Sequence, residues 1–386
     1  MPLPTQLRKR IPSLDGLRAV SIAIVLLAHV SGTRRLEFTS YAHMLSNLGP
    51  FGVKVFFVIS GFLITTLLLN EESVRGRISI SNFFYRRTFR IWPVAYAFIL
   101  VVALLTLSGK ITVPSHNLIY AATFTMNHVQ DEGTWWTGHL WSLAVEEQFY
   151  LVWPLICFLL VTTRARCLAC LAMVLIAPVA RITSYQYAPP IYQAMQSSLF
   201  FVGDAIAIGC LLALLGPRLK ASPLVKNVIG SKCFLIVPLL SVAMYSTLSS
   251  SLWPRFHLAI GDSISLLCIG ATVWRLVHWR DFASKILNRR LFVFVGTISY
   301  SLYIWQQLFL NRYSTAWINR FPQNILAALI ASILSYYLIE LPFFRLRERV
   351  SNRFRPPRTS SASGQTGEEA RAEPVRPDYI MAAPER

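Results

Sequence analysis

Charged residues are scarce in this sequence, and acidic ones are the scarcest. Only 14% of the 386 residues are charged whereas 54% are hydrophobic, and 18 Asp and Glu stand against 37 Lys and Arg. The apolar residues form long blocks separated by short basic segments. This pattern excludes a mainly water-soluble chain and is typical of a polytopic membrane protein.

Cysteines and internal repeats are also scarce. The chain has six cysteines, all within or beside the expected helices. Cys167 and Cys170 form a CxxC pair, but no further Cys or His stands at metal-binding spacing, so we expect buried thiols and no metal site. No repeat is evident in the sequence, which argues against transporter folds built from duplicated halves.

The net charge of +19 is explained better by orientation than by nucleic-acid binding. A basic domain attracts phosphate backbones, but here the basic residues lie between apolar blocks and in the tails. With the N-terminus inside, 29 of the 37 basic residues fall inside and 8 outside, as the positive-inside rule requires. We expect no nucleic-acid partner, and an all-α protein of the plasma (inner) membrane with both termini cytoplasmic and about ten transmembrane helices, at 14–31, 51–69, 89–108, 143–162, 166–181, 198–215, 232–250, 258–278, 291–310 and 323–344.

One integral-membrane domain is expected over residues 1–348. The first apolar run has a basic flank like a signal peptide, but it contains Arg18 and no convincing cleavage site follows it, so we expect it to be retained as a span. After Arg349 the chain turns to Pro, Ser, Gly, Glu and Arg. Such a segment cannot bury an apolar core, so residues 349–386 are expected to be a disordered cytoplasmic tail.

The first expected span carries two polar side chains that are costly in lipid. Arg18 and His29 are eleven positions apart, about three helical turns, so they project from one face about 16 Å apart. Polar groups at membrane depth normally face a cavity or a partner. The alternative is a snorkelling arginine and an unrelated interfacial histidine.

Two later blocks add a possible nucleophile and a cluster of arginines. In "GPFGVKVFFVISGFLI", Ser60 stands next to Gly61, where small residues favour close helix packing over a covalent role. In "FFYRRTFRIWP", Arg86, Arg87 and Arg90 stand at the expected cytoplasmic start of a helix. Anchoring to anionic headgroups and binding of a phosphate ligand explain them equally well.

The block "HLWSLAVEEQFYLVWP" places two adjacent carboxylates, Glu146 and Glu147, a few residues into a span. His139, Trp141 and Ser142 precede them by one to two turns. A purely structural pairing with a neighbouring helix is the alternative to a functional role. Two further acidic residues in expected spans, Asp204 and Asp262, receive no assignment.

Five blocks in order resemble the motifs of the membrane-bound acyltransferase-3 family, the group of sugar O-acyltransferases. Arg18 and His29 match the family's pattern of a basic residue, a ten-residue gap and a histidine. One departure is visible, because many members have Trp-His where this chain has Trp305 and Gln306. Some members also carry a C-terminal periplasmic esterase-like domain, which we do not expect here. The resemblance covers roughly residues 10–345 and rests on "LDGLRAVSIAIVLLAH", "GVKVFFVISGFLI", "FYRRTFRIWP", "HLWSLAVEEQFYLVWP" and "GTISYSLYIWQQ".

The resemblance implies transfer of an acyl group, usually acetyl from acetyl-CoA, to a sugar hydroxyl of a surface polysaccharide, glycolipid or glycosylated small molecule. His29 is then the candidate general base, which Glu146 or Glu147 could orient. The expected partners are acyl-CoA as donor, a carbohydrate acceptor and membrane lipid, with no permanently bound cofactor. We assign donor binding to Arg18, Arg86, Arg87 and Arg90, and acceptor binding to His139, Trp141, Ser142 and Tyr300.

A transporter or flippase for a glycan or lipid-linked intermediate is the competing function. It would also have many spans with buried polar groups, but it would not need this ordered set of motifs. The sequence names neither the acceptor sugar, the acyl length nor the oligomeric state.

Overall fold

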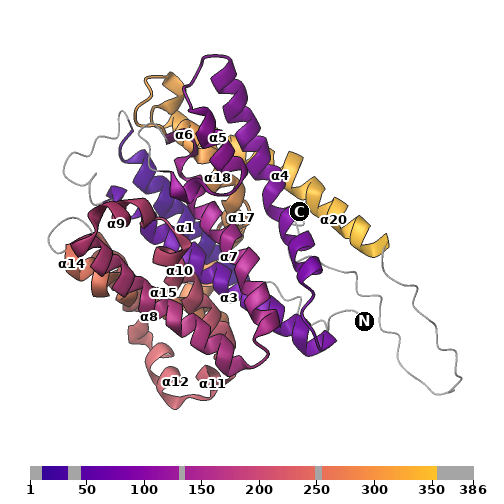
Figure 1. Cartoon of the computed structure of the whole chain (residues 1–386), viewed down its shortest axis with the longest axis vertical. Coiled ribbons are helices and arrows are strands. Elements are labelled where there is room, and N and C mark those ends of the chain that lie inside the picture. Colours follow the sequence, from indigo (N-terminus) through magenta and orange to yellow (C-terminus); the bar gives the residue numbers. More distant parts are fainter. Residues whose placement is uncertain (1–10, 34–44, 130–134, 248–253, 354–386) are drawn as a thin grey trace, which may run out of the picture.

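The computed structural model describes residues 11–33, 45–129, 135–247 and 254–353. Within these ranges the regular elements are all helical (Figure 1). They are α1 (Pro12–Val30), α3 (Gly49–Arg75), α4 (Ile80–Leu107), α5 (Ser115–Ala122), η2 (Met126–His128), α6 (Trp135–Gly138), α7 (Leu140–Leu159), α8 (Thr163–Tyr187), α9 (Pro189–Met195), α10 (Leu199–Leu214), α11 (Gly216–Ala221), α12 (Pro223–Ile229), η3 (Lys232–Ile236), α13 (Val237–Thr247), α14 (Pro254–Phe256), η5 (His257–Gly261), α15 (Asp262–His278), α16 (Phe282–Leu287), α17 (Arg290–Thr297), α18 (Ser299–Phe309), η6 (Trp317–Asn319), α19 (Gln323–Ser335), η7 (Tyr336–Glu340) and α20 (Leu341–Arg353).

Six helical stretches are long and apolar enough to cross a membrane: α1, α3, α4, α6 with α7, α8, and α19 through α20. The number rises to eight if two bent pairs are each one span. These pairs are α9 with α10, bent by 52°, and α12 with η3 and α13, bent by 57°. The expectation of an all-α, multi-pass membrane protein is confirmed, whereas the count of about ten spans is not.

The two remaining expected spans, 258–278 and 291–310, are not among these stretches. Helix α15 has 17 residues and follows the π-helical segment η5 directly. The segment 291–310 divides at Ile298 into α17 and α18, of 8 and 11 residues. At the C-terminal end, α20 continues the chain as helix to Arg353, and the rest of the expected disordered tail, 354–386, lies outside the described residues.

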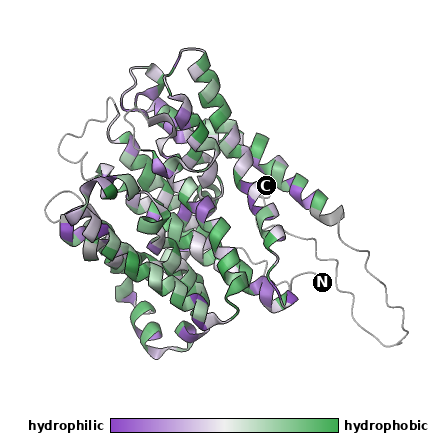
Figure 2. Ribbon diagram, viewed as in Figure 1, coloured by the Kyte–Doolittle hydropathy of each residue, from purple (hydrophilic) through white to green (hydrophobic). Residues whose placement is uncertain are grey.

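The long helices are largely hydrophobic, as the green stretches of the ribbon in Figure 2 show, and many of their large apolar residues are exposed. Helix α8 is an example, because only 17% of its most apolar 18-residue stretch is buried, and residues such as Leu175 and Val179 are exposed. Lipid tails are as apolar as these side chains, so such faces suit a bilayer.

Small residues allow one helix pair, α3 and α10, to approach closely. A Cβ atom on Gly61 of α3 would lie 2.0 Å from the carbonyl oxygen of Ile206 on α10. A Cβ on Gly209 of α10 would lie 2.1 Å from the carbonyl oxygen of Val58 on α3. The prediction that small residues beside Ser60 serve close packing is therefore confirmed.

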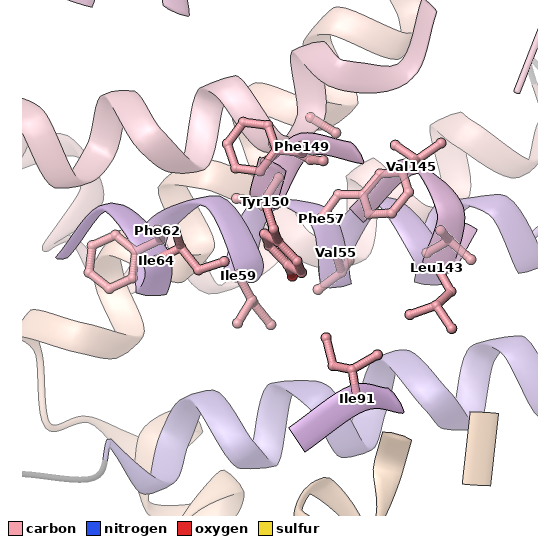
Figure 3. Packing of buried hydrophobic residues seen from close by; sticks show 14 of the residues in the cluster. Val55, Phe57, Ile59, Phe62, Ile64, Ile91, Leu143, Val145, Phe149 and Tyr150 are labelled. Carbon is pink, nitrogen blue, oxygen red and sulfur yellow. The ribbon is translucent and has the colours of Figure 1, made fainter. Parts of the chain in front are cut away.

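Three helices meet at the centre of the molecule. Figure 3 shows Ile59 of α3 and Tyr150 of α7 on the side that faces Ile91 of α4. These three side chains and Phe57 of α3 are buried in one hydrophobic cluster. Helix α1 packs on α3 and on α17, which brings its polar residues beside this centre.

Candidate active site

Three adjoining cavities lie in the described part of the protein, and most of the polar residues singled out in the sequence line them. We call them the arginine cavity, of about 190 Å³, the central cavity, of about 70 Å³, and the aromatic cavity, of about 1240 Å³. Arg87 and Arg90 line both the arginine and the central cavity. Val53 and Tyr303 line both the central and the aromatic cavity. The three cavities therefore form one row.

The arginine cavity lies between α3, α4 and α20 and is rich in cations. Glu71 partly neutralises it, because its two carboxylate oxygens each accept from an arginine at 2.8 Å, Arg75 and Arg86. Sequence reasoning assigned the α4 arginines here but missed the contribution of α20, whose residues stand far along the chain. The cations that line the cavity are Arg75, Arg86, Arg87, Arg90, Arg345 and Arg347.

The central cavity contains the next polar layer. Arg18 lines this cavity together with Arg87 and Arg90, but it does not line the arginine cavity, where Arg86 lies. Ser60 donates to Glu146 Oε1 at 2.8 Å and accepts from the hydroxyl of Tyr150 at 3.0 Å. The guanidinium of Arg87 lies 3.7 Å above the Tyr150 ring. This layer is narrow, and it separates the arginine cavity from the aromatic one.

His29 opens into the aromatic cavity at the far end of α1 from Arg18. Its Nδ1 atom lies 2.7 Å from Oε1 of Gln306 on α18. The amide oxygen can only accept, so Nδ1 carries the proton and Nε2 retains a lone pair. The ring of Trp135 makes an edge contact with the imidazole at 5.6 Å between centroids. The imidazole is thus held in the tautomer that a general base requires.

The suggestion that Glu146 or Glu147 orients His29 is wrong. Glu146 accepts from Ser60 in the central cavity, and its second oxygen lies 3.9 Å from Arg87. Glu147 turns away from all three cavities and accepts from the indole of Trp92 on α4 at 3.1 Å. The two carboxylates are adjacent on α7 and therefore point about 100° apart around the helix.

The four residues assigned to the acceptor divide between two cavities. His139 and Trp141 line the aromatic cavity, whereas Ser142 and Tyr300 line the central one. His139 is fixed by its Nε2, which donates to the carbonyl of Ile304 at 3.0 Å. Its Nδ1 is buried and has no hydrogen-bond partner in the described structure.

Several site residues carried no signal in the sequence by themselves. Gln306 was noted only as a departure from a motif, and Tyr303 lies three residues before it on α18. The Tyr303 hydroxyl donates to the carbonyl of His139 at 2.8 Å and lies 2.7 Å from Ser142 Oγ. Trp135 and Arg312 join them only because α6 and the segment after α18 meet in space. The motif "GTISYSLYIWQQ" was the one available signal for this side of the cavity.

The two unassigned aspartates pair with neighbouring helices. Asp204 of α10 accepts from Arg181 of α8 at 2.7 Å, and Asp262 pairs with Lys54 of α3. Across the described ranges, no group of three or more His, Cys, Asp or Glu side chains could hold a metal ion.

Comparison with known proteins shows which family the chain is similar to. A family model for the acyltransferase-3 group, described as an acyltransferase domain, matches residues 11–340. A Staphylococcus aureus (strain COL) protein provisionally named as an O-acetyltransferase is 32% identical over 372 residues, 86% of this chain and 57% of its own. The O-acetyltransferase OatA of S. aureus (strain NCTC 8325) is 28% identical over 375 residues, 86% of this chain and 57% of its own.

A third relative is named for its substrate. The peptidoglycan O-acetyltransferase OatA of Listeria monocytogenes serovar 1/2a is 27% identical over 364 residues, 87% of this chain and 55% of its own. The chain thus spans a little more than half the length of these curated relatives. No solved structure gives a significant match. Because the family model covers the segment that holds α1, α4, α7 and α18 and the cavities between them, the chain belongs to the acyltransferase-3 family.

Proposed function

We propose that this chain is a membrane-bound O-acyltransferase that moves an acyl group, typically acetyl, from acyl-CoA to a hydroxyl group of a carbohydrate. One observation carries this function: a single row of cavities joins a cluster of arginines to His29. The names of the relatives, which are O-acetyltransferases, agree with it. The acceptor classes are a surface polysaccharide, a glycolipid and a glycosylated small molecule.

The arginine cavity suits the phosphates of CoA. Guanidinium groups bind phosphate through two parallel charge-assisted hydrogen bonds, which a lysine cannot reproduce. Arg87 and Arg90 face both the arginine and the central cavity, so they can hold the phosphates where the pantetheine arm enters. The central cavity, at about 70 Å³, suits an extended arm better than a sugar ring.

The acceptor is then expected from the opposite end. The aromatic cavity is wide, and Trp135, Trp136 and Trp141 supply the flat apolar surfaces on which sugar rings can pack. In the expected orientation, with both termini cytoplasmic in the plasma membrane, CoA enters from the cytoplasm and the sugar from outside. Residues 1–348 would form this integral-membrane domain, and no cofactor would remain bound between turnovers.

His29 supplies the base in this scheme. As the acceptor oxygen attacks the thioester carbonyl, His29 Nε2 takes the hydroxyl proton and a carbon–oxygen ester bond forms. The carbon–sulfur bond breaks, and the leaving thiolate takes the same proton back from the imidazolium. The hydrogen bond from Nδ1 to Gln306 holds the ring in one tautomer throughout.

The test compares His29→Gln with the wild type in proteoliposomes that contain acetyl-CoA and a glycan acceptor. The glutamine side chain keeps a hydrogen-bonding group but cannot accept a proton near neutral pH, so acetyl transfer should fall by about 10²- to 10⁴-fold. Donor binding should persist, because the phosphates bind at the other end of the row. The matched control is His128→Gln, which changes an exposed histidine outside the three cavities. Substantial turnover by His29→Gln would eliminate the base assignment.

A further inference from the structure

The lining of the aromatic cavity carries positive charge and no negative charge. Among its described lining residues, Arg312 is the only cation of an Arg or Lys side chain, and none is Asp or Glu. The other polar groups are neutral hydroxyls and amides, or His29 and His139. A guanidinium in a partly enclosed cavity favours an anion nearby, because charge is poorly screened there.

Arg312 has no partner of its own that would cancel this charge. In the described structure it makes no ion pair or side-chain hydrogen bond, and its Nε is buried without a partner. Its guanidinium lies 5.3 Å from the centroid of the Trp135 ring, a contact that does not neutralise it. The remaining N–H groups are thus available to a ligand.

The surrounding backbone leaves room for this side chain. A Cβ atom on Gly32 would lie 3.0 Å from both Cζ and Nε of Arg312, so the absence of a side chain at position 32 makes room for the guanidinium. The segment after α18 is itself tied down, since Asn319 donates to the carbonyls of Leu308 and Phe309 at 2.9 and 2.7 Å.

Trp135 also places the cation next to the base. Its ring contacts both the imidazole of His29 and the guanidinium of Arg312. The two groups are therefore one indole apart, a separation that a single substituted sugar residue can bridge. A hydroxyl at His29 and an anionic substituent at Arg312 would belong to the same residue of the glycan or to its direct neighbour.

We propose that the acceptor is an anionic carbohydrate, carrying a carboxylate or a phosphate close to the acylated hydroxyl, and that Arg312 is the residue that selects it. This inference rests on the proposed function and narrows its acceptor class. Carboxylate and phosphate present the same pair of oxygens to a guanidinium fork. The experiment therefore separates the two sources of anion.

The test uses three acceptors that differ at one position: methyl glucoside, methyl glucuronide and methyl glucoside 6-phosphate. With the full-length protein in proteoliposomes, at least one anionic acceptor should have a KM about 10- to 100-fold lower than the neutral one, the range of a charged hydrogen bond. Arg312→Gln should raise the KM for that acceptor by a similar factor and leave the neutral one nearly unchanged. Gly32→Ala, which displaces the guanidinium without removing it, should act in the same direction.

Arg320→Gln is the matched control, because Arg320 lies in the same segment but does not line the cavity. Equal KM values for the three acceptors, or an anion preference that survives Arg312→Gln, would overturn the inference. Calorimetric binding of the same three sugars to His29→Gln protein needs no turnover. If no glycan accepts acetyl, the proposed function fails, while the calorimetric preference and its loss in Arg312→Gln still decide the role of Arg312.

Discussion

His29 Nδ1 lies 2.7 Å from Gln306 Oε1, and this hydrogen bond joins residues 277 positions apart in the sequence. Hydrolytic triads use a carboxylate to orient the histidine in the equivalent position. A neutral amide here fixes the tautomer of His29 without adding a negative charge beside it. Gln306 is therefore a positioning residue for the proposed base.

Removing the amide oxygen should lower kcat without affecting substrate affinity. In Gln306→Leu the imidazole loses the acceptor that selects its tautomer, so we expect kcat to fall by about 10²-fold, with KM for donor and acceptor within a factor of about two. Gln306→Glu keeps an accepting oxygen and should recover most of kcat. Steady-state kinetics on both variants, matched for melting temperature, measure the effect, and a wild-type kcat in Gln306→Leu would contradict it.

Removing one of the shared arginines should weaken donor binding. Arg90 borders both the arginine and the central cavity, and a charge-assisted hydrogen bond to phosphate is worth about 1.5–3 kcal/mol. Arg90→Ala should therefore raise the KM for acetyl-CoA about tenfold or more, and Arg90→Lys should restore it only in part. The same loss is expected for Arg347→Ala on α20.

Arg77→Ala is the control for these variants, since Arg77 is exposed, follows α3 closely in the sequence and lines none of the three cavities. It should leave the KM for acetyl-CoA unchanged. A uniform effect of all basic substitutions would indicate binding to lipid headgroups in place of a donor site.

Overpacking the contact between α3 and α10 should lower the stability of the folded protein. In Gly61→Ala the new methyl group would meet the backbone of Ile206 at 2.0 Å, which only a shift of a helix can relieve. Overpacking of this kind costs about 1–3 kcal/mol or more, so the melting temperature and the yield of folded protein should fall. Gly216→Ala, whose Cβ would meet only Trp274 at 3.8 Å, should melt like the wild type.

Much of the fold could be predicted from residue patterns within single segments. Long apolar blocks with basic ends predict helices in lipid, and six of them have the expected length and character. Breaks such as the one at Ile298 between α17 and α18 could not be predicted, because hydropathy averages over a window and does not record where a helix turns.

The candidate site divides in the same way. The eleven-residue spacing predicted that Arg18 and His29 share one helix face, and they open into the central and the aromatic cavity, which adjoin. The hydrogen-bond partner of His29 was predicted wrongly. The adjacent Glu146 and Glu147 of α7 gave no information about which helix would lie beside His29.

The sequence by itself determined the local properties of this protein: its helices, its affinity for a membrane, and the polar residues that one helix presents on one face. Those properties follow from contacts within a few turns, where the period of the helix fixes the geometry. Only the tertiary structure decided that Gln306 holds His29, that α20 adds arginines to the arginine cavity and that Arg312 stands one indole from His29. Such contacts depend on how helices pack, and packing is set by the shapes of many side chains together.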